Sequence, residues 1–170
     1  IPTPGHAAHH VAFRHGPHLY RGEAAGTYST LGQGSDTADY YLRPATPPRF
    51  FPDTARASLE RLMALDPVPE HLLFAHHGEH TGEGLGLLTA ARDQIDLWVN
   101  TVDETLTTLR ALPHSEQPQD EEALMALLRN ELADRDPLYA RGRDLPDDIR
   151  ERERDFTRQT LRGILGHLKG

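Results

Sequence analysis

The sequence contains no cysteine, which excludes disulfide bonds and metal sites built from thiolates. It has no run of 18 apolar residues, so no transmembrane span is expected. The first residues lack the basic and apolar regions of a secretory signal, and a cytoplasmic location is the default expectation. Acidic residues outnumber basic residues, and a chain with a net charge of −8 repels phosphate backbones. We therefore expect that the protein binds neither a membrane nor a nucleic acid.

The pattern of apolar residues predicts an α/β chain with few strands. Residues 10–24 are typical of two short strands around the turn HGPH, and residues 71–77 of a buried strand. The stretch 25–52, rich in glycine and proline, is expected to be a long irregular loop. A sheet of only three short strands has unpaired edge strands. We therefore expect the sheet to contain more strands than the sequence pattern predicts. The predicted helices cover residues 54–65, 84–111, 119–133 and 146–168. Asp53 is the expected N-cap of the first helix. Phe156 is expected on the apolar stripe of the fourth helix.

Histidines are concentrated in the first half of the chain, where nine of the 11 lie within residues 1–80. His6 follows a proline–glycine turn, Glu23 follows Gly22, and His76 comes at the end of the predicted buried strand. Two imidazoles and a carboxylate brought together at strand ends are the ingredients of a zinc, iron or manganese site. Scattered surface or turn histidines are the alternative, because the spacing alone imposes no local geometry. No Gly-x-Ser-x-Gly elbow supports a serine hydrolase.

Several motifs, taken in order, resemble one family. The stretch TPGHAAHH resembles the TPGH-x-x-x-H turn of the metallo-β-lactamase fold superfamily. YRGEAAG is similar to the strand and Gly-Asp motif that follow it there, with Glu23 in the place of the aspartate. YLRPATPPRF, LLFAHHG and the terminal RERERDFTRQTLRGILGHL continue the likeness over nearly the whole chain.

This resemblance implies a metal-dependent hydrolase that uses a metal-bridging water as nucleophile and acts on a small-molecule substrate. His6, Glu23 and His76 take the places of metal ligands, with zinc as the expected metal and iron or manganese as alternatives. His10 matches the second histidine of the family's turn motif and takes a supporting position behind the ligands. His77 is a further supporting candidate as the neighbour of His76, without a counterpart in the family. The loop at 27–51 is expected to cover the site. Its candidates for substrate contact are Tyr40, Tyr41 and Arg43, with packing beneath the loop as the alternative.

The family's H-x-H-x-D-H motif is absent, so the chain resembles only the second half of such a protein. The implied fold is half of a four-layer αβ/βα sandwich with additional C-terminal helices: residues 1–112 form the half-fold and residues 113–170 a helical extension packed on it. A homodimer or a separate N-terminal half is the expected partner. Glu23 is one methylene longer than the family aspartate, and the alternatives are that it binds one metal only, displaces the bridge between two metals or marks a lost site. The alternative function is a catalytically degenerate, self-associating interaction module.

Overall fold

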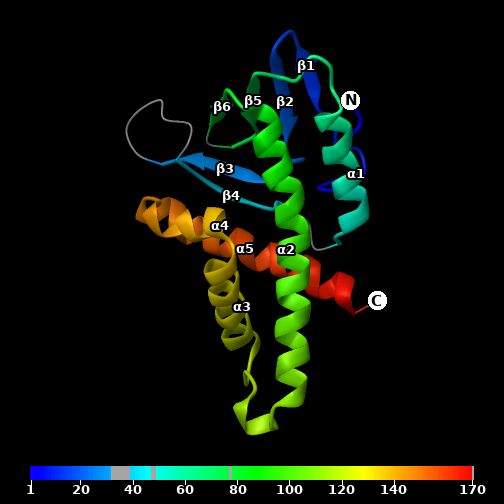
Figure 1. Cartoon of the computed structure of the whole chain (residues 1–170). Coiled ribbons are helices and arrows are strands. Elements are labelled where there is room, and N and C mark those ends of the chain that lie inside the picture. Colours follow the sequence, from blue (N-terminus) through cyan, green and yellow to red (C-terminus); the bar gives the residue numbers. More distant parts are fainter. Residues whose placement is uncertain (32–38, 47–48, 77, 170) are drawn as a thin grey trace.

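The computed structural model describes residues 1–31, 39–46, 49–76 and 78–169, and shows a mixed α/β chain (Figure 1). Its strands are β1 Phe13–His15, β2 His18–Gly22, β3 Thr27–Thr30, β4 Tyr40–Arg43, β5 His71–Phe74 and β6 Glu79–Thr81. Its helices are α1 Pro52–Met63, α2 Gly84–Ala111, α3 Glu121–Arg135, α4 Pro137–Ala140 and α5 Asp147–Leu168, with short 3-10 helices η1 His114–Glu116 and η2 Arg141–Asp144. Among these helices, none combines the length and apolar composition needed to cross a membrane.

The strands form a four-stranded sheet in the order β1-β2-β5-β6 and a separate β3-β4 hairpin. Within the larger sheet, β2 and β5 run parallel, while β1 and β6 pair antiparallel with their neighbours. Gly22 at the end of β2 is paired with Phe74 at the end of β5. Because parallel strands end at the same edge of a sheet, the residues that follow each strand leave the sheet side by side.

The structure corrects three local predictions. The stretch 25–52 is not wholly irregular, because β3 and β4 pair within it, with Tyr28 opposite Leu42 and both buried. Asp53 is not the N-cap of α1: Phe51 is, because Pro52 takes the first helical position that proline favours. The strand β6 was not expected.

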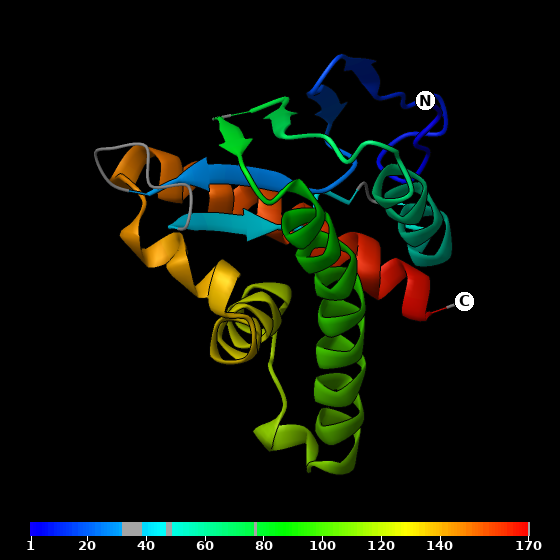
Figure 2. The ribbon, with the colours of Figure 1, turned by 45° about the horizontal axis from the view of Figure 1, so that its top comes forward.

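Helices cover both the sheet and the hairpin, and their apolar faces meet in a shared core. This core contains Leu19 and Leu72 from the sheet, Trp98 from α2, Leu128 from α3 and Leu161 from α5, all with no exposed surface. The helices of 113–170 therefore pack on the first part of the chain. Figures 1 and 2 show α5 running along the β3-β4 hairpin, on the side away from the larger sheet.

One buried carboxylate fixes the turn between α3 and α4. Asp136 accepts hydrogen bonds from Gln94 Nε2 and Trp98 Nε1 of α2, each at 2.7 Å. Its other oxygen accepts the first backbone N–H groups of α4. A buried carboxylate with four donors ties the C-terminal helices to α2, which holds α5 against the hairpin.

Candidate metal centre

His6 lies on a turn that is pressed against α1. Gly5 has a φ of +144°, and a Cβ at this position would lie 2.9 Å from Ala55 Cα, so only glycine fits. The hydroxyl of Ser58 donates to the carbonyl of Pro4 at 2.6 Å and holds the turn in place. The Nδ1 atom of His6 lies 3.1 Å from the carbonyl oxygen of Ala45, to which it donates its proton. The Nε2 atom therefore faces the site.

Glu23 follows β2 through a second special glycine. Gly22 has a φ of +57°, and a Cβ there would come within 2.5 Å of His10 Nε2. That nitrogen accepts the backbone N–H of Glu23 at 3.1 Å, while Nδ1 lies 2.8 Å from the hydroxyl of Thr3. Both ring nitrogens of His10 are thus occupied, and the ring positions the backbone of Glu23.

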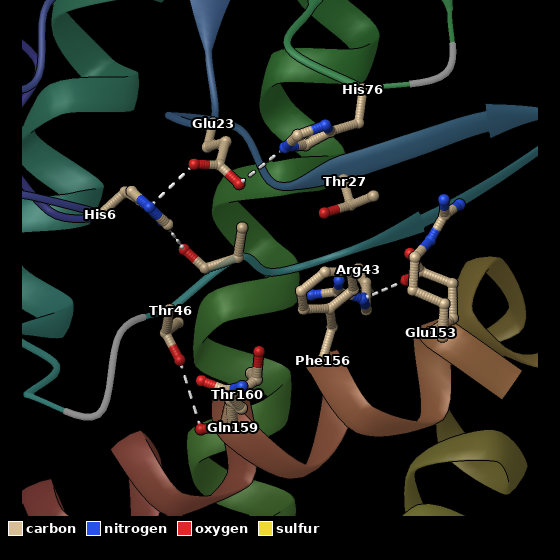
Figure 3. Close-up of a pocket in the computed structure, with 12 residues that line it drawn as sticks. His6, Glu23, Thr27, Arg43, Thr46, His76, Glu153, Phe156, Gln159 and Thr160 are labelled. Carbon is tan, nitrogen blue, oxygen red and sulfur yellow. Dashed lines mark hydrogen bonds and ion pairs between the residues drawn. The ribbon is translucent and has the colours of Figure 1, made fainter. Parts of the chain in front are cut away.

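His76 reaches the same carboxylate from the end of β5. The backbone N–H of Ala75 donates to the carbonyl of Gly22 at 3.2 Å, which extends the pairing of the two strands to the site. Glu23 Oε2 lies 2.8 Å from His6 Nε2, and Oε1 lies 3.4 Å from His76 Nε2 (Figure 3). The carboxylate of Glu23 therefore stands between the two imidazoles, with one oxygen toward each.

The electrostatics of the site favour a charged His6–Glu23 pair. The hydrogen bond to Glu23 raises the pKa of His6 above its ordinary value of 6.5, against the opposing effect of burial. The same contact lowers the pKa of Glu23 below 4.5. Burial lowers the pKa of His10, and the nearby His6 adds to this effect. His10 is therefore held in its neutral form, as its two hydrogen bonds require.

A cavity of about 520 Å³ opens beside these residues. Its opposite wall is the helix α5, whose Glu153, Phe156 and Thr160 line it. On the hairpin side, Arg43 donates from Nε to Glu153 Oε2 at 2.5 Å, and both side chains are almost fully buried. A cavity of this size suits a small molecule.

The structure brings together the three residues predicted as ligands and places His10 directly behind Glu23. Arg43 lines the cavity, but Tyr41 is buried at 1% exposure and donates its hydroxyl to Glu153. Tyr40 stacks on Tyr28, with ring centroids 5.3 Å apart. The two tyrosines are not among the residues that line the cavity. His77 and parts of the 27–51 loop, residues 32–38 and 47–48, lie outside the described residues.

Sequence reasoning missed the contribution of α5 to the cavity. Phe156 was expected on the buried stripe of this helix, whereas its side chain is 43% exposed and lines the cavity. Glu153 is the buried partner of Arg43, 110 positions away in sequence. In the sequence, Glu153 and Phe156 are three positions apart, which predicts that they share one face of the helix. The spacing does not predict which part of the protein that face contacts.

Within the described part of the chain, no group of three or more histidine, aspartate or glutamate side chains is arranged to hold one metal ion. In the described residues, the contacts of this cluster are those of the Glu23 carboxylate with His6 and with His76. Neither the models of known protein families nor the curated proteins compared with the sequence match it.

Proposed function

We propose that this chain is the second half of a metal-dependent hydrolase of the metallo-β-lactamase type, with His6, Glu23 and His76 as its metal ligands. The observation that carries the proposal is the carboxylate of Glu23, whose two oxygens lie 2.8 Å and 3.4 Å from the Nε2 atoms of His6 and His76. A carboxylate shared by two imidazoles is the donor arrangement of a site for two metal ions. The extra methylene of Glu23 does not prevent this contact.

The donor chemistry fits zinc, and equally iron or manganese. Zinc accepts imidazole nitrogen and carboxylate oxygen, and metal-ligating histidines commonly donate their second ring N–H to a backbone carbonyl. His6 has this partner in Ala45, and loss of its Nε2 proton leaves a lone pair facing the site. When bound, a metal ion supplies Lewis-acid activation of water and of the bond to be cleaved.

The residues of this chain hold and orient that chemistry. Glu23 contributes negative charge between the two imidazoles, and His10 fixes the backbone from which its side chain extends. The Arg43–Glu153 pair forms a rigid, charge-balanced wall beside the site. With α5 as the far wall, the cavity receives a small-molecule substrate.

The remaining ligands come from a second copy of the chain or from a separate N-terminal half that carries H-x-H-x-D-H. In the proposed fold, that half completes the four-layer αβ/βα sandwich. The larger sheet offers a surface for association: Phe13 and Tyr20, partners across β1 and β2, are 65% and 46% exposed. A pair of exposed aromatic side chains on a sheet favours burial against a partner.

Metal analysis of the purified, untagged chain tests this proposal. After dialysis against zinc, we expect stoichiometric metal by atomic emission, and hydrolysis of ester, thioester, lactam or phosphodiester substrates that a chelator abolishes. Sedimentation analysis shows whether the zinc-loaded chain is a dimer, as a second copy that supplies the missing ligands requires. A metal-free, stably folded protein whose stability is unchanged by chelator contradicts the proposal.

One observation favours a second candidate, a degenerate, self-associating interaction module. Each metal position receives only one imidazole and part of one carboxylate from the described residues, while an apolar sheet surface is exposed. In that case the chain forms a dimer through Phe13 and Tyr20 and binds no metal. The metal analysis separates the two candidates, because only the hydrolase loses its metal in Glu23→Gln.

A further inference from the structure

Phe156 differs from the other apolar residues of its helix. Leu161, Ile164 and Leu165 of α5 are at most 8% exposed, whereas Phe156 is 43% exposed. Its side chain lines the cavity that also contains His6, Glu23 and His76 (Figure 3). An aromatic ring open to a cavity beside a reactive centre is a typical contact for the apolar part of a ligand.

The ring of Phe156 lies beside the side chain of Arg43. The guanidinium carbon of Arg43 lies 5.5 Å from the centroid of the Phe156 ring. Arg43 is itself held by Glu153 and by a hydrogen bond from Nη1 to the carbonyl of Pro44 at 3.0 Å. A ring that already packs against a well-held side chain loses less conformational freedom when a ligand packs on it than a ring without such a contact.

Apart from the long polar side chains of Arg152 and Gln159, the remaining lining is small or charge-balanced. Thr27, Ala45, Thr46 and Thr160 present short side chains, and the opposite charges of Arg43 and Glu153 compensate one another. The space between the candidate metal ligands and α5 therefore suits a flat, apolar group, for which Phe156 is the largest contact surface. Such stacked or edge-on aromatic contacts stabilise beyond simple burial.

We infer that Phe156 is the specificity-determining residue of this site and that it selects substrates carrying a planar apolar group on the acid side of the cleaved bond. The inference rests on the proposed function. Hydrolysis adds water across that bond: the acid product keeps the planar group and gains the hydroxyl, and the leaving group departs with the proton. The acid product therefore retains the group that contacts Phe156.

Product-like acids test this inference directly. Titration calorimetry on the zinc-loaded chain compares phenylacetate with acetate, and phenylphosphonate with methylphosphonate. We expect the aromatic member of at least one pair to bind about tenfold more tightly than its methyl counterpart. The pair that shows this preference identifies acyl or phosphoryl chemistry.

Three variants isolate the ring. Phe156→Ala and Phe156→Leu should reduce the aromatic preference to about twofold or less, and the leucine variant keeps the apolar volume if alanine perturbs the fold. Phe51→Ala is the matched control, because Phe51 is 59% exposed and is not among the residues that line this cavity. It should leave the preference unchanged.

The outcomes separate the inference from the proposed function. An equal affinity for aromatic and methyl acids, no binding of any of the four, or a preference that survives both Phe156 variants overturns the inference, even if zinc binds. Absence of zinc binding removes the metal-dependent hydrolase and, with it, the assignment of the planar group to the acid side of a cleaved bond. A Phe156-dependent preference for the aromatic acids, measured on the metal-free chain, then supports only the role of Phe156 as the contact for a planar apolar group.

Discussion

The Nε2 atom of His10 accepts the backbone N–H of Glu23 at 3.1 Å, across 13 positions of sequence. Its Nδ1 atom lies 2.8 Å from the hydroxyl of Thr3, so the first turn of the chain and the end of β2 are joined by one imidazole. Because both nitrogens are used, His10 acts on the site only through Glu23.

Replacing His10 by alanine should weaken zinc binding about 10–100-fold, the usual effect of losing a group that orients a ligand. It should also lower the free energy of unfolding by about 1–3 kcal/mol, because the N–H of Glu23 loses its acceptor. Calorimetry and denaturant unfolding measure the two effects. His9→Ala is the matched control, since His9 is exposed. Equal zinc affinity in the two variants contradicts the positioning role.

Two glycines with the same φ angle provide a second comparison. Gly16 and Gly22 both have a φ of +57°, but a Cβ at Gly16 meets nothing within 4 Å, whereas one at Gly22 meets the ring of His10. Both alanine variants carry the cost of about 1–2 kcal/mol for a left-handed residue. Gly22→Ala should cost at least about 1 kcal/mol more in denaturant unfolding, because the ring must move. Equal losses would show that His10 adapts freely.

The His6–Glu23 pair predicts a pH dependence of stability. A raised pKa for His6 stabilises the fold below pH 6.5 and loses this effect as the pH rises through the higher folded-state value. A lowered pKa for Glu23 stabilises above pH 4.5 and loses its effect as the pH falls through the lower folded-state value. Glu23→Gln should therefore destabilise the metal-free protein more at pH 5.5 than at pH 8. Chemical unfolding at both values measures this, and a larger loss at pH 8 contradicts it.

Arg21 predicts an unusual response to a core substitution. Its side chain is fully buried, and among the described residues none of its three guanidinium nitrogens has a hydrogen-bond partner. The guanidinium carbon lies 3.1 Å from the centroid of the Phe74 ring, a contact that offsets part of the cost of burying the charge. Burial also lowers the pKa of Arg21.

Arg21→Met should therefore raise the free energy of unfolding by about 1 kcal/mol or more, because it removes a buried charge and keeps an apolar contact with Phe74. Arg92→Met, at a partly exposed arginine paired with its neighbour Asp93, should change it by less than about 0.5 kcal/mol. Denaturant unfolding compares the two. A loss of more than about 1 kcal/mol in Arg21→Met would mean that the guanidinium stabilises the core.

The sequence was sufficient where local patterns determine structure. The apolar spacing predicted α2 correctly, and the turn at Gly16 predicted the pairing of β1 with β2. It was insufficient for β3 and β4, whose pairing depends on contacts with α5 and α2 rather than on strand patterning. The structure places Glu23 and His76 together because β2 and β5 run parallel, and His6 reaches them from the turn held against α1, which no spacing of residues reveals.

The α5 wall of the cavity could not be predicted for the same reason. The pairing of Arg43 with Glu153 joins residues on a hairpin and on the last helix, and it depends on the three-dimensional path between them. Phe156 follows a helical pattern that normally indicates burial, yet its ring lines the cavity. A helix pattern shows which residues share a face, and packing decides whether that face is buried.

Zinc titration of the untagged chain by calorimetry tests the central claim most directly. The account predicts that zinc binds and that His6→Ala, Glu23→Gln and His76→Ala each weaken binding at least tenfold, while His9→Ala and His114→Ala leave it unchanged. Zinc affinity that is the same in all five variants and in the original chain, or no binding at millimolar zinc, would contradict the claim that these three residues form a metal centre.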